Sequence, residues 1–327
     1  MQAFDYLRPT SPDAAIAALG AEGKFIGGGT NLVDLMKSGV ETPHRLVDVN
    51  HLGLDKIEST DAGGLRIGAA VRNSDVANDR QVRESHPLLS QALLDGASPQ
   101  LRNLATVGGN LMQRTRCDYF VDPAFAHCNK RNPGSGCGAR DGFNRYHAIL
   151  GASPACVAVH SSDQNVALLA LDASVIVRGK DGERRVALNE FHRLPGDHPE
   201  VDTVLKPGEL IVAVELPPSR AARHSRYVKV RERASYAFAL VSAAVALDVQ
   251  DGRLQGGRIA LGSVAHKPWL AEKANALLSG HDLGDLDFAA IAKASVDGAQ
   301  ALRENGYKIA LAQRAVERAL RAAAGAA

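Results

Sequence analysis

Short apolar runs that alternate with glycine-rich turns characterise the N-terminal part of the chain. The β-prone run at 24–26 leads through three glycines into apolar positions with helical spacing, and a second β-prone run follows at 45–49. The segment 65–71 is the next predicted strand, and the apolar spacing over 86–98 predicts a helix before a second pair of glycines. These elements predict a mixture of strands and helices.

This periodicity disappears from about 113 to 150, where Gly, Pro, Asn, Arg and Cys are frequent. A loop of this length in a compact domain is usually functional or disordered. Regular patterning returns with a strand expected from Cys156, a hairpin turned at 180–183 and a strand at 209–217. The irregular segment is therefore predicted to be an insertion in a domain that closes near residue 218.

A polar linker at 217–225 separates this domain from a C-terminal part with its own pattern. Two long β-prone runs there flank the dipeptide Asp-Gly at 251–252, which is typical of a hairpin turn. Alanine-rich amphipathic helices are expected after them, at 271–279, 286–299 and 307–323. The sequence therefore predicts an α+β protein with one domain over 1–218 and a smaller α+β domain over 219–327.

The overall composition is that of an ordinary globular protein and limits the choice of partners. Apolar residues make up 45% of the 327 positions, enough for two or three domains with cores of their own. The formal charge of +2 predicts no binding of nucleic acid. Neither a signal peptide nor a bilayer-spanning run is evident. We expect no membrane insertion, and a chain that is cytoplasmic, or periplasmic if a signal-bearing partner exports it folded.

The glycine run between the first predicted strand and helix is a candidate binding site. Residues 27–29 are all glycine, and the absent Cβ atoms let backbone N–H groups approach a ligand closely. The run contains no Lys or Arg, so it predicts a pyrophosphate held by N–H dipoles with help from Thr30 and Asn31. Leu32 occupies the place of the third glycine in a dinucleotide fingerprint. A tight turn with positive φ is the alternative explanation.

A second glycine loop, at 105–110, repeats these ingredients. Its two glycines are flanked by Thr106 and Asn110. Two such loops in one domain suit a long ligand with a diphosphate in its middle, although a pair of glycines also commonly makes a simple turn.

Several segments resemble, in this order, the flavoprotein subunit of the xanthine oxidase and carbon monoxide dehydrogenase family. They are IGGGTNLVDLMK, ATVGGN, the SSD at 161–163, GELIVAVELP, YVKVRERASYAFALVSAAVAL and VAHKPW. The resemblance implies a two-lobed FAD-binding domain of the vanillyl-alcohol oxidase (PCMH) type, with lobes at about 1–55 and 56–218, followed by a small α+β domain. FAD is therefore the expected ligand of the two glycine loops.

The FAD contacts of the family fall on matching positions of this chain. By resemblance, the first glycine run holds the pyrophosphate and the second loop closes over it. Asp163 accepts hydrogen bonds from the ribityl hydroxyls, while Ile211 and Lys229 lie beside the isoalloxazine. The FAD-binding residues implied in this way are Ile26, Gly27, Gly28, Gly29, Thr30, Asn31, Leu32, Thr106, Gly109, Asn110, Asp163, Ile211 and Lys229.

All four cysteines, Cys117, Cys128, Cys137 and Cys156, fall in and just after the irregular segment. Their spacing matches neither paired C-x2-C zinc ribbons nor bacterial ferredoxins. Four cysteines in a Gly/Pro-rich loop suit a [4Fe–4S] cluster, a tetrahedral zinc ion or two disulfides. Six Lys or Arg against three Asp over 113–150 leave a local positive charge, which suits either metal centre. Spacing and charge leave these alternatives open.

The local motifs favour one alternative by resemblance. RTRC, HCNKR, PGSGC and SPAC are similar to an insertion in the flavin subunits of bacterial molybdenum aldehyde oxidoreductases, which carries an extra [4Fe–4S] cluster. The benzoyl-coenzyme-A type reductases also insert a cluster, but their motifs are less similar. The resemblance implies that the four cysteines in the insertion at about 113–156 bind a [4Fe–4S] cluster, with His127 as a bystander.

The resemblance implies electron transfer rather than substrate oxidation by this chain. No molybdopterin motif and no [2Fe–2S] cysteine set is found, so the expected partners are a large molybdenum-cofactor subunit and a small subunit with two [2Fe–2S] clusters. They are expected to form a heterotrimer or a dimer of heterotrimers that oxidises an aldehyde. The alternatives are a self-contained FAD oxidase, the flavin subunit of a xanthine or aromatic acyl-CoA hydroxylase, and a zinc-stabilised assembly module. The sequence specifies neither the substrate nor the final electron acceptor.

Overall fold

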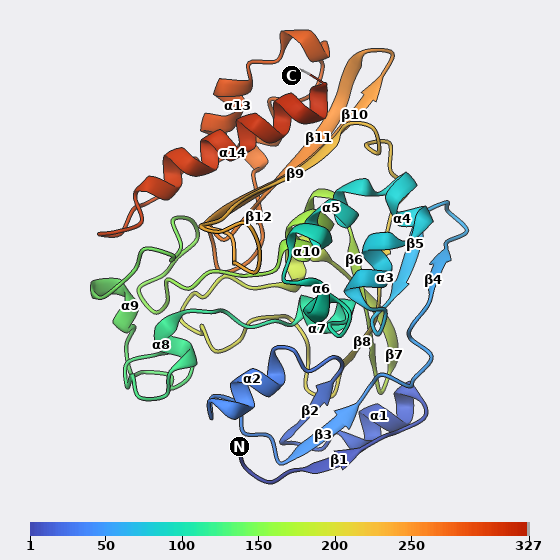
Figure 1. Ribbon diagram of the computed structural model, residues 1–327, viewed down its shortest axis with the longest axis vertical. Helices are drawn as coiled ribbons and strands as arrows, with labels where there is room; N and C mark the ends of the chain where they lie inside the picture. Colours follow the sequence, from blue (N-terminus) through green and yellow to red (C-terminus); the bar gives the residue numbers. More distant parts are fainter. Residues whose placement is uncertain (326–327) are drawn as a thin grey trace.

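The strands form three separate sheets over residues 1–325, which the computed structural model describes (Figure 1). Their strand orders are β1-β3-β2, β4-β5-β8-β6-β7 and β12-β11-β10-β9, and the sheets follow one another from the bottom to the top of Figure 1. Helices pack on the second and third sheets, so the predicted α+β class is confirmed. No helix within residues 1–325 is long and apolar enough to span a bilayer.

The first sheet is parallel because helices connect its strands. β1 (Asp5–Leu7) and β2 (Gly23–Ile26) both pair with β3 (Arg45–Asp48). The connecting helices are α1 (Pro12–Ala18) and α2 (Leu32–Lys37). The predicted unit of strand, glycine loop, helix and strand is confirmed.

The second sheet is antiparallel and carries the largest apolar core. Its strands are β4 (Ile57–Ser59), β5 (Leu65–Gly68), β8 (Leu210–Leu216), β6 (Ser174–Gly179) and β7 (Gly182–Ala187). The helices that complete this core are α3 (Asn73–Asn78), α4 (Arg80–Ser85), α5 (Pro87–Asp95), α7 (Val107–Leu111), α10 (Asp163–Ala170) and α11 (Leu188–Phe191). β8 is buried on both faces: Val214 lies in this core, and Val212 packs with Val47 of the first sheet.

The third sheet is antiparallel and is covered on one face by the C-terminal helices (Figure 1). Its strands are β9 (Ser225–Val230), β10 (Val241–Gln250), β11 (Arg253–Gly262) and β12 (Trp269–Leu270). The helical segments that follow are α12 (Glu272–Asn275), η1 (Leu283–Asp285), α13 (Phe288–Ala294) and α14 (Tyr307–Ala324). The predicted hairpin is confirmed, because Asp251 and Gly252 turn β10 into β11 with positive φ.

The cysteine-rich insertion contains little regular structure, as its lost periodicity predicts. Within it lie the short helices α8 (Asp118–Val121) and α9 (Gly138–Asp141). Cys128 and Cys137 pair across an isolated antiparallel bridge. In Figure 1 this segment stands to one side of the sheets.

Three local predictions are wrong. The second glycine loop is mostly helix, because the Thr106 side chain caps the start of α7, which follows α6 (Pro99–Arg102). The described backbone at 156–162 forms no strand before α10. The helices predicted at 271–279 and 286–299 are shorter, and the start of α13 is fixed by the Asp287 side chain, which accepts from the Ala290 N–H.

Candidate functional site

A cavity of about 410 Å³ lies where the residues just after the first glycine run, α7, the end of α5 and the third sheet meet. The residues that line it come from both predicted domains, with Lys229 on β9 and Phe238 on the segment between β9 and β10. Six of the residues that the sequence predicts to bind FAD line this cavity: Thr30, Asn31, Gly109, Asn110, Asp163 and Lys229. The structure therefore brings six of the predicted residues to one cavity.

The first glycine run packs against the chain just before α7, which explains two of its glycines. A Cβ at Gly28 would lie 2.0 Å from the Leu104 carbonyl oxygen, and a Cβ at Gly27 would lie 2.7 Å from the Thr106 hydroxyl. Gly29 has φ +71°, which a residue with a side chain rarely adopts. The sequence predicts that these glycines let a ligand approach the backbone. In the structure, Gly27 and Gly28 instead let the two loops pack closely against each other. None of the three glycines lines the cavity, and nor do Ile26 and Leu32 at the ends of the segment.

The second glycine pair presents the first turn of α7 to the cavity. The Thr106 hydroxyl is buried and accepts from the Gly109 N–H at 3.1 Å, so it is engaged as the helix cap. The Asn110 carboxamide oxygen accepts from the Ser162 hydroxyl at 2.7 Å and from the Gln113 amide at 2.5 Å. This places Gly109 and Asn110 at the cavity wall, with Thr106 behind them.

Asp163 and Lys229 form a buried ion pair at the cavity wall. The Lys229 Nζ lies 2.8 Å from Asp163 Oδ2, with side chains 1% and 10% exposed, and it also donates to the Asp95 carbonyl at 3.1 Å. The Tyr227 hydroxyl donates to Asp163 Oδ1 at 2.6 Å. Burial and the Asp163 charge raise the pKa of Tyr227 well above its ordinary value. The sequence identified the two charged residues separately but not their pairing, and it missed Tyr227.

Ile211 is not brought to this cavity. It lies on β8 opposite Val177, at a point where the register of the strand pair shifts, and its side chain is buried in the large core. The residues that line the cavity do not include it.

Arg116 adds a positive charge to the cavity, whereas the first glycine run itself contains no Lys or Arg. It belongs to the cysteine-rich insertion, and its guanidinium lies 5.1 Å from the centre of the Phe238 ring. Burial lowers the pKa of Arg116 below its ordinary value. The glycine run gives no indication of this residue, because Arg116 follows Asn31 by 85 positions and only tertiary packing brings both to one cavity.

A second cavity, of about 350 Å³, extends from the first toward the cysteines. The residues that line both cavities are Arg116, Ser161, Arg233, Ala237 and Phe238. Cys117 and His147 line the second cavity but not the first. The two cavities are therefore adjacent, and together they reach from the glycine loops to Cys117 on one side of the cysteine group.

The four cysteines surround one small enclosed space. Cys128 and Cys156 are buried, and Cys117 and Cys137 are half-buried. All four are free thiols, so the structure contains neither of the two disulfides that were an alternative to a metal centre. Burial raises the pKa of Cys117 to about 12 and that of Cys156 to about 11. Metal binding would have to displace these protons, since thiolates are the ligands.

The four cysteines, all within the described residues, do not form a preformed site for a single metal ion. Among residues 1–325, no three His, Cys, Asp or Glu side chains come close enough together to hold one metal ion. One zinc ion needs its four sulfurs at about 2.3 Å from a common centre, whereas a cluster of several irons takes its ligands from a wider ring. His127 also faces the enclosed space, but its Nδ1 is occupied by the Ser135 carbonyl at 2.8 Å.

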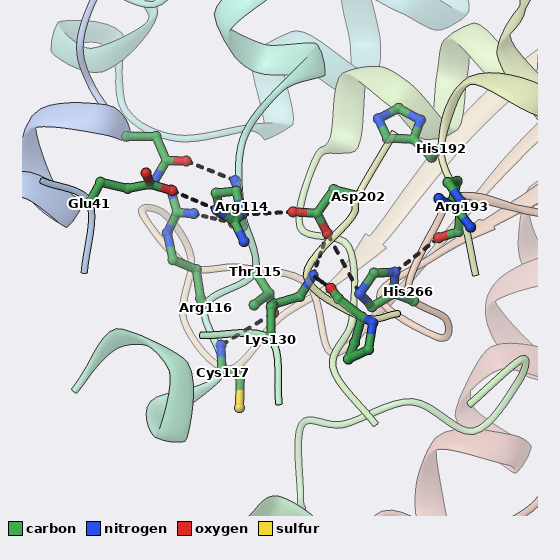
Figure 2. Close-up of polar contacts among 12 residues, drawn as sticks. Glu41, Arg114, Thr115, Arg116, Cys117, Lys130, His192, Arg193, Asp202 and His266 are labelled. Carbon is green, nitrogen blue, oxygen red and sulfur yellow. Dashed lines mark hydrogen bonds and ion pairs between the residues drawn. The ribbon is translucent and has the colours of Figure 1, made fainter. Parts of the chain in front are cut away.

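An ion network joins the first glycine loop to the cysteine segment (Figure 2). The Arg114 N–H donates to the Asn31 carboxamide oxygen at 2.8 Å, and its guanidinium pairs with Glu41 at 2.5 Å and with Asp202 at 2.7 Å. Asp202 also pairs with Lys130, whose side chain is buried. Burial raises the pKa of Asp202, but the Lys130 and Arg114 charges outweigh it and hold that pKa below its ordinary value.

Known protein families match the chain over nearly its full length. A family model described as the FAD binding domain in molybdopterin dehydrogenase matches residues 2–219. A second, described as the CO dehydrogenase flavoprotein C-terminal domain, matches residues 226–323.

Individual relatives show the same similarity. The aldehyde oxidoreductase FAD-binding subunit PaoB of Escherichia coli (strain K12) is 54% identical over 319 residues, which cover 96% of each chain. The 6-hydroxypseudooxynicotine dehydrogenase complex subunit alpha of Paenarthrobacter nicotinovorans is 30% identical, over 90% of this chain and 84% of the relative. The solved structure of carbon monoxide dehydrogenase from Hydrogenophaga pseudoflava superposes with a TM-score of 0.76 at 26% identity, and covers 99% of this chain and 98% of its own. Quinoline 2-oxidoreductase from Pseudomonas putida 86 gives a TM-score of 0.74 at 26% identity with the same coverage.

Proposed function

The chain belongs to the FAD-binding medium subunits of the xanthine oxidase and carbon monoxide dehydrogenase family, and we propose that it is the electron-transfer flavoprotein of a molybdenum-dependent aldehyde oxidoreductase. The observation that carries this proposal is the pair of adjoining cavities that reaches from the glycine loops to Cys117, which also lines the small space enclosed by the four cysteines. The 54% identity to an aldehyde oxidoreductase subunit supports the choice of an aldehyde.

The residues around the first cavity fit FAD. Gly109 and Asn110 would meet the pyrophosphate together with Thr30 and Asn31, and the Asp163–Lys229 pair would meet the ribityl and isoalloxazine parts. When bound, FAD supplies both one-electron and two-electron transfer. The chain's part is to hold the flavin and to keep one charged pair beside it in a largely buried site.

The cysteine group fits a [4Fe–4S] cluster held by Cys117, Cys128, Cys137 and Cys156. Four free thiols around one enclosed space support this assignment. The division into a FAD-binding domain over 1–218 and a C-terminal domain over 219–327 is part of the same proposal. The apolar cluster between the third sheet and the C-terminal helices supports it, although Tyr227, Ala244, Ala246 and Ala260 of this sheet pack into the core of the first domain.

Substrate oxidation is assigned to partners. We assign the molybdenum cofactor to a large subunit and two [2Fe–2S] clusters to a small subunit, in a heterotrimer or a dimer of heterotrimers. The relatives named as medium chains and complex subunits support a multi-subunit assembly.

The proposed function is tested by the cofactors and the activity of the purified chain. We expect non-covalent FAD together with about four irons and matching acid-labile sulfide per chain, and no aldehyde oxidation until the molybdenum and [2Fe–2S] subunits are co-expressed. Absorbance spectra, metal and sulfide analysis and an aldehyde-dependent dye assay measure these. Turnover of an aldehyde by the lone chain would support a self-contained oxidase instead.

Two glycines in the loops are expected to respond differently to substitution. Gly28→Ala should destabilise the fold by about 1–3 kcal/mol, because its Cβ would lie 2.0 Å from a backbone carbonyl. Gly109→Val should affect folding less, since its Cβ would meet only the Thr106 hydroxyl oxygen, at 3.0 Å. It should weaken FAD binding at least about tenfold, because it adds a branched side chain at the cavity wall. Thermal unfolding and flavin titration separate the two effects.

Gly284→Ala is the matched control, because no atom lies within 4 Å of the added Cβ. It should change neither stability nor FAD affinity. Wild-type FAD affinity in Gly109→Val would show that the second loop does not contact the flavin.

A further inference from the structure

His147 makes a direct side-chain contact with one of the four cysteines. Its Nε2 lies 3.1 Å from Cys117 Sγ, and the residue is buried. The other ring nitrogen, Nδ1, is also buried and has no hydrogen-bond partner within the described residues. The ring therefore makes its one polar contact with the sulfur.

The direction of this hydrogen bond follows from the state of the sulfur. A thiolate that binds iron carries no proton, so it can only accept. A neutral imidazole carries its proton on one of its two nitrogens. With Cys117 as a ligand, the contact requires that proton on Nε2, which then donates to the sulfur.

The C-terminal helix α14 and the turn before it hold His147 in place. The His147 carbonyl accepts from the Lys308 Nζ at 2.9 Å and from the Asn305 amide at 3.2 Å. Both of these side chains are completely buried, and Lys308 also donates to the carbonyls of Tyr146 and Ser263. The backbone that carries the imidazole is thus anchored by buried contacts from the C-terminal part of the chain.

Cys117 and His147 also lie on the side of the cysteine group that faces the FAD cavity. Among the described residues, Cys117 is the one cysteine that lines the second cavity, and His147 lines it too. That cavity shares Arg116 and Phe238 with the first. The cysteine group therefore opens toward the flavin on the side where His147 contacts the sulfur.

We propose that His147 is a positioning residue for electron transfer, whose Nε2–H bond to the Cys117 sulfur raises the reduction potential of the cluster at its edge toward FAD. The inference rests on the proposed [4Fe–4S] cluster. Hydrogen bonds to ligand sulfurs are among the features that set cluster potentials, because they offset the extra negative charge of the reduced form. Removal of this donor makes the cluster harder to reduce.

The test is the midpoint potential of the cluster in the purified full-length chain, followed by electron paramagnetic resonance. In His147→Phe we expect the ratio of reduced to oxidised cluster at a fixed potential to fall about tenfold, equivalent to about 59 mV for one electron. His147→Gln restores a donor and is expected to recover most of this shift. The potential of the bound FAD serves as the internal reference.

His86→Phe is the matched control. His86 is also buried, but its Nε2 contacts the Pro217 carbonyl at 2.9 Å and its Nδ1 contacts the Ser85 hydroxyl at 2.8 Å, so both ring nitrogens have partners other than a cysteine. This variant should leave the cluster potential unchanged.

The outcomes separate this inference from the proposed function. An unchanged potential in His147→Phe, with iron and sulfide at wild-type amounts, overturns the role of His147 but leaves the cluster. If His147→Phe loses its iron, His147→Leu takes its place as the variant without a donor: a tenfold fall in the reduced-to-oxidised ratio that His147→Gln reverses supports the role, and an unchanged ratio overturns it. Wild-type protein without iron or sulfide overturns the cluster itself.

Discussion

Replacing Asp163 with Asn is expected to leave the purified chain without FAD and to lower its free energy of unfolding by about 3–5 kcal/mol. The substitution removes the carboxylate from a Lys229 side chain that is 1% exposed, so the lysine charge would be buried without a counter-charge. The same change weakens the acceptor of the Tyr227 hydroxyl. Denaturant unfolding and the flavin absorbance of the purified protein measure the two effects.

Asp172→Asn is the control for this substitution. Asp172 pairs with Arg258 at 2.9 Å, but the two side chains are 64% and 31% exposed, so its loss should cost at most about 1 kcal/mol. The double variant Asp163→Asn with Lys229→Met removes both buried charges and should recover much of the stability without recovering FAD. Wild-type stability in Asp163→Asn alone would contradict the buried-pair argument.

Cys128→Ser is expected to remove the broad visible absorption of the cluster and about four irons per chain. Up to about residue 142 the insertion has little apolar packing to replace the metal. Phe120 and Cys128 share a small cluster with Leu35 of α2, whereas Ile149 and Leu150 further on lie in the core of the third sheet. Cluster binding therefore supplies much of the folding energy of this segment, which should exchange its amide hydrogens faster in the variant. Iron and sulfide analysis and hydrogen exchange over about 113–142 measure these changes.

FAD should remain bound to Cys128→Ser, though more weakly. The glycine loops lie outside the insertion, but the Arg114 N–H holds Asn31 of the first loop. Asn132→Ser, an exposed change in the same segment, should keep both cofactors. Zinc without iron or sulfide in anaerobically purified wild-type protein would exclude the cluster and leave the FAD assignment unaffected.

Local patterns in the sequence determined much of the fold. Apolar periodicity and turn residues indicate the strand and helix around the first glycine run, the β10–β11 hairpin and α14. These features depend on residues a few positions apart, so a short window of sequence contains their causes. The insertion is evident for the same reason, because its four cysteines and its lack of periodicity are local properties.

The detailed site was decided by tertiary structure. Capping by Thr106 turns an expected loop into α7, and contact with Leu104 explains Gly28 without a ligand. The pairing of Asp163 with Lys229 joins positions 66 apart. Ile211 lies in the core, although the resemblance implies a place beside the flavin.

The sequence by itself therefore determined which residues were available, and tertiary packing determined which of them meet. Contacts such as those of Arg116 with Phe238 and of His147 with Cys117 depend on how sheets, helices and the insertion pack around one another. Such packing depends on many weak interactions between distant parts of the chain, and the periodicity or spacing of a short segment does not contain that information.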